Sequence, residues 1–213
     1  NGLFERLKEL RVGPEHHFIA LQEYGNFVDL IRKTVETRNI ELIALGTKGA
    51  SGRKASVVGT NTGDVITKVA CNVLVVPEKA SIALPKKIVF PTDYNIFYSH
   101  EILEVISELL QITKAKLQVL NVLKSGLKLT EEQEKNKEYL KHYLEETFSG
   151  SHRFYDVIDK SVRTAIQHHV VIGNAEMVIM VAKNLNFLQS LLFDSTIEKL
   201  SFHTTVPLLV LHE

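Results

Sequence analysis

The feature that most constrains the fold is an internal repeat in which the second half of this 213-residue chain resembles the first. At a constant offset of 135 positions, residues 41–45 align with residues 176–180, and residues 73–78 align with residues 208–213. Apolar positions match over about 60 residues, and duplication of one unit explains this better than chance similarity. On this register the counterpart of Ile88 precedes residue 1, so we expect the first unit to lack its first strand, first helix and second strand.

Short runs rich in branched apolar residues alternate with amphipathic helical stretches along the whole chain. This alternation predicts an α/β fold with parallel strands, and the near-continuous apolar runs indicate helices on both faces of each sheet. The segment 77–85, which begins and ends with proline, is the expected linker between domains 1–82 and 86–213. The predicted strands are Phe18–Gln22, Glu41–Leu45, Val73–Val76, Lys87–Phe90, Lys116–Val122, Phe154–Ile158, Met177–Val181 and Leu208–Leu211.

Residues 130–148 form the clearest predicted helix, because Thr130 and Gln133 have the spacing of a capping box and apolar residues follow at helical intervals.

Charge is balanced, with 25 basic and 25 acidic residues, which gives no indication of a nucleic-acid partner. The longest nearly apolar stretch, 170–182, is too short for a membrane helix. A single cysteine, Cys71, and the lack of a secretory leader favour a cytoplasmic location.

A glycine-rich segment follows the predicted strand 41–45 and carries the strongest candidate site. Glycines let the backbone turn sharply and let N–H groups approach an anion, and the start of the next helix adds unpaired donors and a favourable dipole. The alternative is an ordinary strand-to-helix loop with a glycine and threonine cap. The residues concerned are Gly46, Thr47, Lys48, Gly49 and Gly52 in the loop and Gly59, Thr60, Asn61 and Thr62 at the helix start.

The spacing Gly-x2-Gly-x9-Gly-Thr resembles the ATP-binding signature of the universal stress protein family (UspA-like). Residues 41–49, 73–77 and 87–93 are similar to the fourth strand and loop, the fifth strand and the first strand of that family. The resemblance implies two Rossmann-like, doubly wound units of the adenine-nucleotide-alpha-hydrolase type, with strand order 3-2-1-4-5. It also implies that the protein binds ATP, with or without Mg²⁺. The ATP phosphates would lie against Gly46, Gly49, Gly59 and Thr60. The residues beside them would be Thr47, Lys48, Asn61 and Thr62.

The second unit shows the complementary half of that site. The resemblance implies that Asp93, Asn121 and Val122 line an adenosine pocket. The counterparts of the phosphate-loop glycines include Val181 and Asp194, and a carboxylate at a helix start repels phosphate, so we expect no triphosphate there. The apolar segment 185–193 is expected either to pack in the core, which is the simpler interpretation, or to fill the cleft and bind a partner.

The expected function is nucleotide-dependent regulation in the stress response. Two alternatives stay open, a slow ATPase and a nucleotide-independent module that binds a protein or small ligand. The loop has no obvious base, because its nearest carboxylate, Asp64, lies in the first turn of a helix, and we therefore assign no catalytic residue. The histidines include two adjacent pairs, His16–His17 and His168–His169. If such a pair lies in a helix, its two side chains point about 100° apart, which argues against a metal site.

Two expectations concern strand edges. Strands 73–77 and 208–212 should pair with each other in an intramolecular pseudo-dimer, because a bare apolar edge invites aggregation; a homodimer is a further alternative. The first unit should also show a gap beside strand 41–45. Upstream residues, another copy or fragment, or a shift of strand 18–22 onto strand 41–45 would each fill it.

Overall fold

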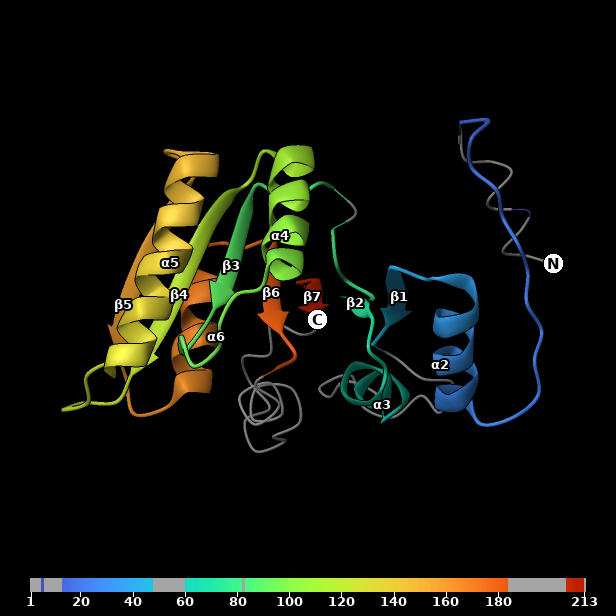
Figure 1. Ribbon diagram of the computed structural model, residues 1–213, viewed down its shortest axis with the longest axis horizontal. Coiled ribbons are helices and arrows are strands. Elements are labelled where there is room, and N and C mark those ends of the chain that lie inside the picture. Colours follow the sequence, from blue (N-terminus) through green and yellow to red (C-terminus); the bar gives the residue numbers. More distant parts are fainter. Residues whose placement is uncertain (1–4, 6–12, 48–59, 82, 184–205, 213) are drawn as a thin grey trace.

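The computed structural model describes residue 5 and residues 13–47, 60–81, 83–183 and 206–212. These residues form one seven-stranded sheet with helices on both faces (Figure 1). In chain order the elements are α2 (Phe27–Arg38), β1 (Leu42–Gly46), α3 (Thr60–Lys68), β2 (Asn72–Val76), β3 (Lys87–Pro91), α4 (His100–Thr113), β4 (Lys116–Leu123), α5 (Glu131–Phe148), β5 (His152–Ile158), α6 (Val162–Ile172), β6 (Met177–Val181) and β7 (Leu208–Leu211).

The strand order is β1-β2-β7-β6-β3-β4-β5. All neighbouring strands run parallel except β2 and β7, which are antiparallel. The strands of residues 86–213 are β3 to β7. If they are numbered 1 to 5 in chain order, they lie in the sheet in the order 3-2-1-4-5. The predicted α/β class is therefore confirmed, and all the strands share one sheet because strands of the two parts pair with each other.

The antiparallel contact between β2 and β7 joins the two parts of the sheet. Val73 lies opposite Val210 and Val75 opposite Leu208, so the predicted pairing of strands 73–77 and 208–212 is confirmed. All four residues are buried. Because each strand would otherwise end its part of the sheet, this pairing removes two apolar edges at once.

The predicted strand Phe18–Gln22 is wrong. The segment has no strand structure, and its apolar side chains are exposed, with Ile19 at 70%. Branched apolar residues favour a strand only where a neighbouring backbone completes the ladder. No strand of the described chain pairs with this segment, and it has not shifted onto β1, which pairs with β2 alone.

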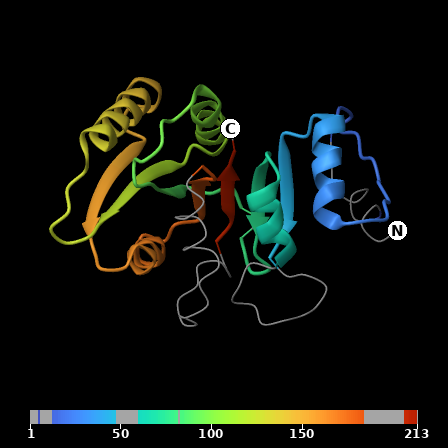
Figure 2. The ribbon, with the colours of Figure 1, turned by 60° about the horizontal axis from the view of Figure 1, so that its bottom comes forward.

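Helices cover both faces of the sheet (Figure 2), and a hydrophobic cluster lies on each face. On one face α4 and α5 bury Ile102, Ile106 and Leu140 against β3, β4 and β6. On the other face α3 and α6 bury residues such as Ile66 and Ile166. α2 differs from these helices because none of its side chains is buried.

Local signals fix the helix boundaries. The predicted helix 130–148 is present as α5, and Thr130 and Gln133 form the expected capping box. Asn26 caps α2, with its side-chain oxygen accepting from the N–H groups of Val28 and Asp29. Among the described residues, no helix is long and apolar enough to cross a membrane.

Candidate functional site

The first candidate site lies where β1 ends and α3 begins. The hydroxyl of Thr62 donates a hydrogen bond to the carbonyl oxygen of Gly46 at 3.0 Å. Thr62 is 7% exposed, and Val65 and Ile66 of the same helix are fully buried. This packing holds the N-terminus of α3 at the carboxyl end of β1, which is where open α/β sheets place their ligands.

Gly46 is an exposed residue at the end of β1. A Cβ built on this residue would meet no atom within 4 Å, so the space beside the backbone is open. Thr47 is half-buried and Asn61 is exposed. The structure thus places Gly46, Thr47, Asn61 and Thr62 near one another along the β1–α3 junction.

The remaining residues of this predicted site are not all placed. Lys48, Gly49, Gly52 and Gly59 lie outside the described residues, and so do the residues 184–205 that contain Asp194. Thr60 is the first residue of α3. Thr62 already donates its single hydroxyl hydrogen to Gly46, so it positions the helix and has only acceptor capacity left for a ligand.

Asp64 takes part in a structural contact. Its carboxylate lies 2.8 Å from the ammonium of Lys68, one turn further along α3. An exposed ion pair of this kind is worth less than about 1 kcal/mol, but it occupies the nearest carboxylate.

The second candidate site begins at Asp93, just after β3. One carboxylate oxygen of Asp93 accepts from the N–H of Asn95 at 3.1 Å, and the other accepts from its side-chain amide at 2.8 Å. Gln133 of α5 donates to the carbonyl oxygen of Asp93 at 2.7 Å. The carboxylate is therefore oriented by its own turn, and α5 fixes the backbone.

Asn121 is the most unusual residue of the predicted adenosine pocket. It is 1% exposed, yet neither its amide oxygen nor its amide nitrogen has a hydrogen-bond partner. Burying an unpaired polar group costs about 1–3 kcal/mol, so a native chain usually keeps such a group for a reason. Val122 follows in the strand and packs against the hydrophobic cluster that contains α3 and α6. Successive side chains of a strand point to opposite faces, so Asn121 and Val122 cannot line one surface.

A polar residue that the sequence analysis missed lies beside Asn121, and further polar groups follow from it. Asp156 lies opposite Asn121 on β5 and accepts from the Lys137 ammonium at 2.8 Å. The same ammonium lies 5.7 Å from the centre of the Tyr94 ring. Tyr94 is fully buried, its hydroxyl has no partner, and burial raises its pKa well above the usual range, with the charge of Asp156 adding to the effect.

The turn that carries Tyr94 explains why sequence reasoning missed it. Tyr94 has a φ of 56°, a left-handed conformation that is uncommon for a bulky residue. Asn136, 42 residues further along the chain, donates to its carbonyl oxygen at 2.9 Å. A contact between residues so far apart in the sequence leaves no local sequence pattern. An asparagine in the interior of a helix is a weak indication that its side chain has such a contact.

The two candidate sites are separate. β2, β7 and β6 lie between β1 and β3, so four strand steps of about 4.8 Å, or about 19 Å across the sheet, separate the two strands. The antiparallel contact of β2 with β7 also puts the carboxyl end of β1, with Gly46, at the opposite edge of the sheet from the carboxyl end of β3, with Asp93. One ligand cannot use the phosphate half at β1 together with the adenosine half at β3 and β4. Across the described ranges, no group of three histidine, cysteine, aspartate or glutamate side chains could hold a metal ion.

Comparisons with known proteins agree with this architecture. Residues 4–77 match the model of the universal stress protein family. This match covers the segment that carries the glycine spacing, and it supports the resemblance that the glycine spacing and strand motifs indicated. No curated protein matches the chain.

Solved structures share the fold over most of the chain. A functionally unknown protein from Pseudomonas aeruginosa PAO1 is 17% identical with a TM-score of 0.62, covering 99% of this chain and 76% of its own. A candidate universal stress protein from Pseudomonas aeruginosa UCBPP-PA14 is 18% identical with a TM-score of 0.61, covering 99% and 77%. A universal stress protein from Archaeoglobus fulgidus DSM 4304 is 20% identical with a TM-score of 0.59, covering 87% and 65%. At these identities the likeness shows a shared fold.

Proposed function

We propose that this protein binds ATP and acts as a nucleotide-dependent regulator in the stress response. The observation that carries the proposal is the open space beside Gly46 at the N-terminus of α3, held in place by the Thr62 hydroxyl. The match of residues 4–77 to the universal stress protein family supports the same conclusion. We assign residues 1–82 and 86–213 to two units, of which the first carries the phosphate loop.

The chemistry of the first unit suits a phosphate group. Unpaired N–H groups at the start of α3 and the positive end of its dipole favour an anion, and Gly46 lets a phosphate oxygen approach the backbone. Lys48, Gly49, Gly59 and Thr60 complete the proposed phosphate loop, and Thr47, Asn61 and Thr62 lie beside it. Mg²⁺ would neutralise part of the phosphate charge when it accompanies ATP.

In the second unit we propose a nucleoside site without triphosphate. The buried Asn121 amide offers one acceptor and one donor group, the pair that a base edge such as that of adenine complements. Asp93, held by Asn95, lies at the end of the adjacent strand β3. Val122 contributes packing from the opposite face of β4.

Titration calorimetry with ATP tests the first site through Gly46→Val. Because a Cβ at Gly46 meets nothing within 4 Å, the substitution should leave the fold intact while it fills the phosphate space. We expect at least a tenfold loss of ATP affinity. Ala44→Val, an exposed change in the same strand, is the matched control and should bind ATP normally. Unchanged binding by Gly46→Val would refute the site.

Calorimetry and a phosphate-release assay together separate the alternatives. Binding without hydrolysis fits regulation, whereas steady phosphate release would make the protein a slow ATPase. If ATP does not bind at all, a nucleotide-independent binding module replaces the proposal.

The lone Cys71 supports a cytoplasmic location, and the β2–β7 contact supports an intramolecular pseudo-dimer.

A further inference from the structure

Two aromatic side chains are stacked on the outer surface of the second unit. The rings of Phe97 and Tyr139 have centroids 5.1 Å apart and an interplanar angle of 25°. Both side chains are exposed, Phe97 at 57% and Tyr139 at 42%. Phe97 lies in the loop before α4 and Tyr139 in the middle of α5, two helices on the same face of the sheet (Figure 1, Figure 2). Contiguous exposed apolar surface often marks an interaction site.

Contacts around the aromatic pair hold it in place. The hydroxyl of Tyr143 in α5 lies 2.7 Å from the hydroxyl of Ser107 in α4. Next to Phe97 in the chain, the Tyr98 side chain is fully buried, and its hydroxyl lies 2.6 Å from that of Thr92. The two helices and the loop between β3 and α4 are therefore fixed relative to one another, and the aromatic surface is formed before a partner binds.

The two helices beside the aromatic pair are strongly acidic. α4 and α5 together contain nine glutamates and three lysines, and no aspartate or arginine, whereas the whole chain has equal numbers of acidic and basic residues. All nine glutamates are exposed. Of the lysines, Lys137 is directed toward β5, where its ammonium lies 2.8 Å from the Asp156 carboxylate. This surface is therefore negatively charged and favours a cationic partner.

The acidic residues that follow Phe97 form a stripe along α4. Glu101, Glu104 and Glu108 are three and four positions apart, so they share one face of the helix over about 10 Å. Within the described part of the chain, none of the three lies in an ion pair. Hydrogen bonds from its own backbone N–H and from the Ser99 hydroxyl lower the pKa of Glu101, so this carboxylate stays ionised.

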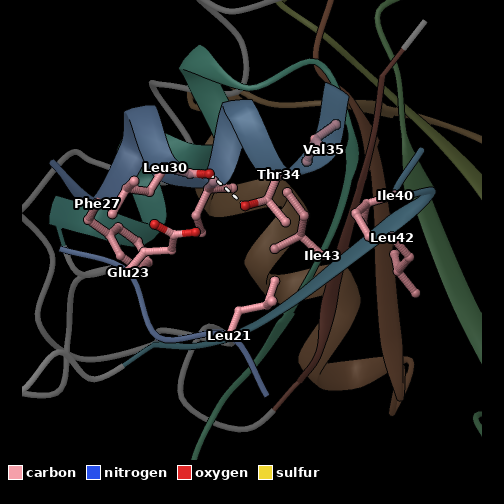
Figure 3. Close-up of a pocket in the computed structure, with 10 residues that line it drawn as sticks. Leu21, Glu23, Phe27, Leu30, Thr34, Val35, Ile40, Leu42 and Ile43 are labelled. Atoms are coloured by element: carbon pink, nitrogen blue, oxygen red, sulfur yellow. Dashed lines mark hydrogen bonds between the residues drawn. The ribbon is translucent and has the colours of Figure 1, made fainter. Parts of the chain in front are cut away.

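A second exposed apolar surface gives no comparable indication of a partner. The pocket of about 420 Å³ between α2 and β1 is lined by ten residues, of which Glu23 and Thr34 are polar (Figure 3). The Thr34 hydroxyl already donates to the carbonyl oxygen of Leu30 at 2.8 Å. A single carboxylate among apolar side chains does not define the chemistry of a partner, whereas the surface beside Phe97 combines aromatic rings with a row of carboxylates.

We propose that Phe97, Tyr139 and the glutamates of α4 bind an arginine-bearing segment of a partner polypeptide. A guanidinium group is planar and always charged, stacks on aromatic rings, and forms paired hydrogen bonds with a carboxylate. A lysine ammonium satisfies the charge but lacks the planar face. Because the glutamate stripe extends over two helical turns, the partner segment should carry at least two cationic residues.

The charge of the surface also decides against other classes of partner. Phosphate groups of a nucleic acid and anionic lipid headgroups are attracted by basic residues, and the exposed glutamates repel them. The aromatic surface includes neither Gly46 nor Asn121, so the proposal does not depend on nucleotide binding.

Fluorescence anisotropy with labelled peptides tests the proposal on the 213-residue chain. The probe is a fluorescein-labelled peptide of alternating arginine and alanine residues. We expect saturable binding that weakens as salt is added, since exposed charges are screened. The same peptide with lysine in place of arginine should bind at least tenfold more weakly, and the peptide with glutamine should not bind.

Substitutions on the chain separate stacking from charge. Phe97→Leu and Tyr139→Leu keep an apolar side chain but remove the aromatic ring, and each should weaken binding of the arginine peptide at least fivefold. Glu104→Gln should weaken binding of both cationic peptides. The matched controls are Tyr24→Leu, at a fully exposed tyrosine before α2, and Glu36→Gln, at an exposed glutamate of α2; neither should change binding. Circular dichroism checks that each variant is folded.

Three results would overturn the proposal. The first is the absence of saturable binding. The second is equal affinity for the arginine and lysine peptides, or unchanged binding by folded Phe97→Leu, because either would reduce the effect to unspecific charge attraction. The third is a dimer of the chain that Phe97→Leu abolishes and the arginine peptide does not compete with, which would assign the surface to a second copy.

Discussion

Leu74 of β2 pairs with Leu209 of β7, and the two residues are each other's counterparts in the 135-residue repeat. The flanking pairs are reciprocal, since Val73 lies opposite Val210 and Val75 opposite Leu208, the counterparts of Val75 and Val73. A symmetric dimer contact has this reciprocity. The register therefore supports the proposed pseudo-two-fold relationship between the units.

Truncation of Leu209 tests how much this contact stabilises the fold. Leu209 is 6% exposed, and Leu209→Ala should lower the free energy of unfolding by about 2–5 kcal/mol. Leu84→Ala, at a site 63% exposed, should change it by less than about 0.5 kcal/mol. Urea unfolding followed by circular dichroism measures both. Equal stabilities of the two variants would show that the strand contact contributes little.

Two buried tyrosines should respond oppositely to loss of the hydroxyl group. The Tyr98 hydroxyl lies 2.6 Å from the Thr92 hydroxyl, so Tyr98→Phe should lower the free energy of unfolding by about 1–2 kcal/mol. The Tyr94 hydroxyl is buried without a partner, so Tyr94→Phe should leave stability unchanged or raise it by about 1 kcal/mol. A loss for Tyr94→Phe in urea unfolding would mean that this hydroxyl has a bound partner.

Asn121→Leu separates stability from binding at the second candidate site. Both amide atoms are buried and unpaired, so an apolar side chain of similar size should raise the free energy of unfolding by about 1–2 kcal/mol. The same change should abolish adenosine binding measured by calorimetry. If the variant is more stable and still binds adenosine normally, the unpaired amide of Asn121 has no function in binding.

Stability should depend on pH through His169. Burial, with a smaller contribution from the charge of His168, lowers the pKa of His169 below its ordinary value of 6.5. Below that value the unfolded chain takes up more protons than the folded one, so the free energy of unfolding should fall as the pH drops from about 7 to 5. Above about pH 7 this contribution is fully present.

His169→Gln tests that assignment in urea titrations at several pH values. The variant should lose less stability on acidification than the wild type. Some dependence should persist, because burial also lowers the pKa of His212. An unchanged pH dependence would show that His169 does not carry it.

The sequence predicted most of the fold because local and tertiary preferences agree. The continuous apolar runs at β3, β4, β6 and β7 are strands covered on both faces, and the capping box at Thr130 starts α5. Phe18–Gln22 failed for a physical reason. Its composition suits a strand, but a strand forms only against another backbone, and composition does not report whether one is present.

The candidate sites were harder to predict than the strands. The junction of Gly46 with Thr62 follows from the order strand, loop, helix, so its place could be expected. The buried position of Tyr94 could not, since this residue has a left-handed backbone conformation and is held by Asn136 from a distant helix. A single sequence shows which residues are polar but does not show which ones folding leaves buried without partners.

The central position of β7 has a consequence for folding during synthesis. β7 is the last of the seven strands to leave the ribosome, yet it lies between β2 and β6 and contacts both. Until residues 208–211 emerge, the two parts of the sheet have no strand to join them, and two apolar edges face water together. The nascent chain therefore passes through an interval in which it is most prone to associate with other chains. That interval ends only when the final strand closes the sheet.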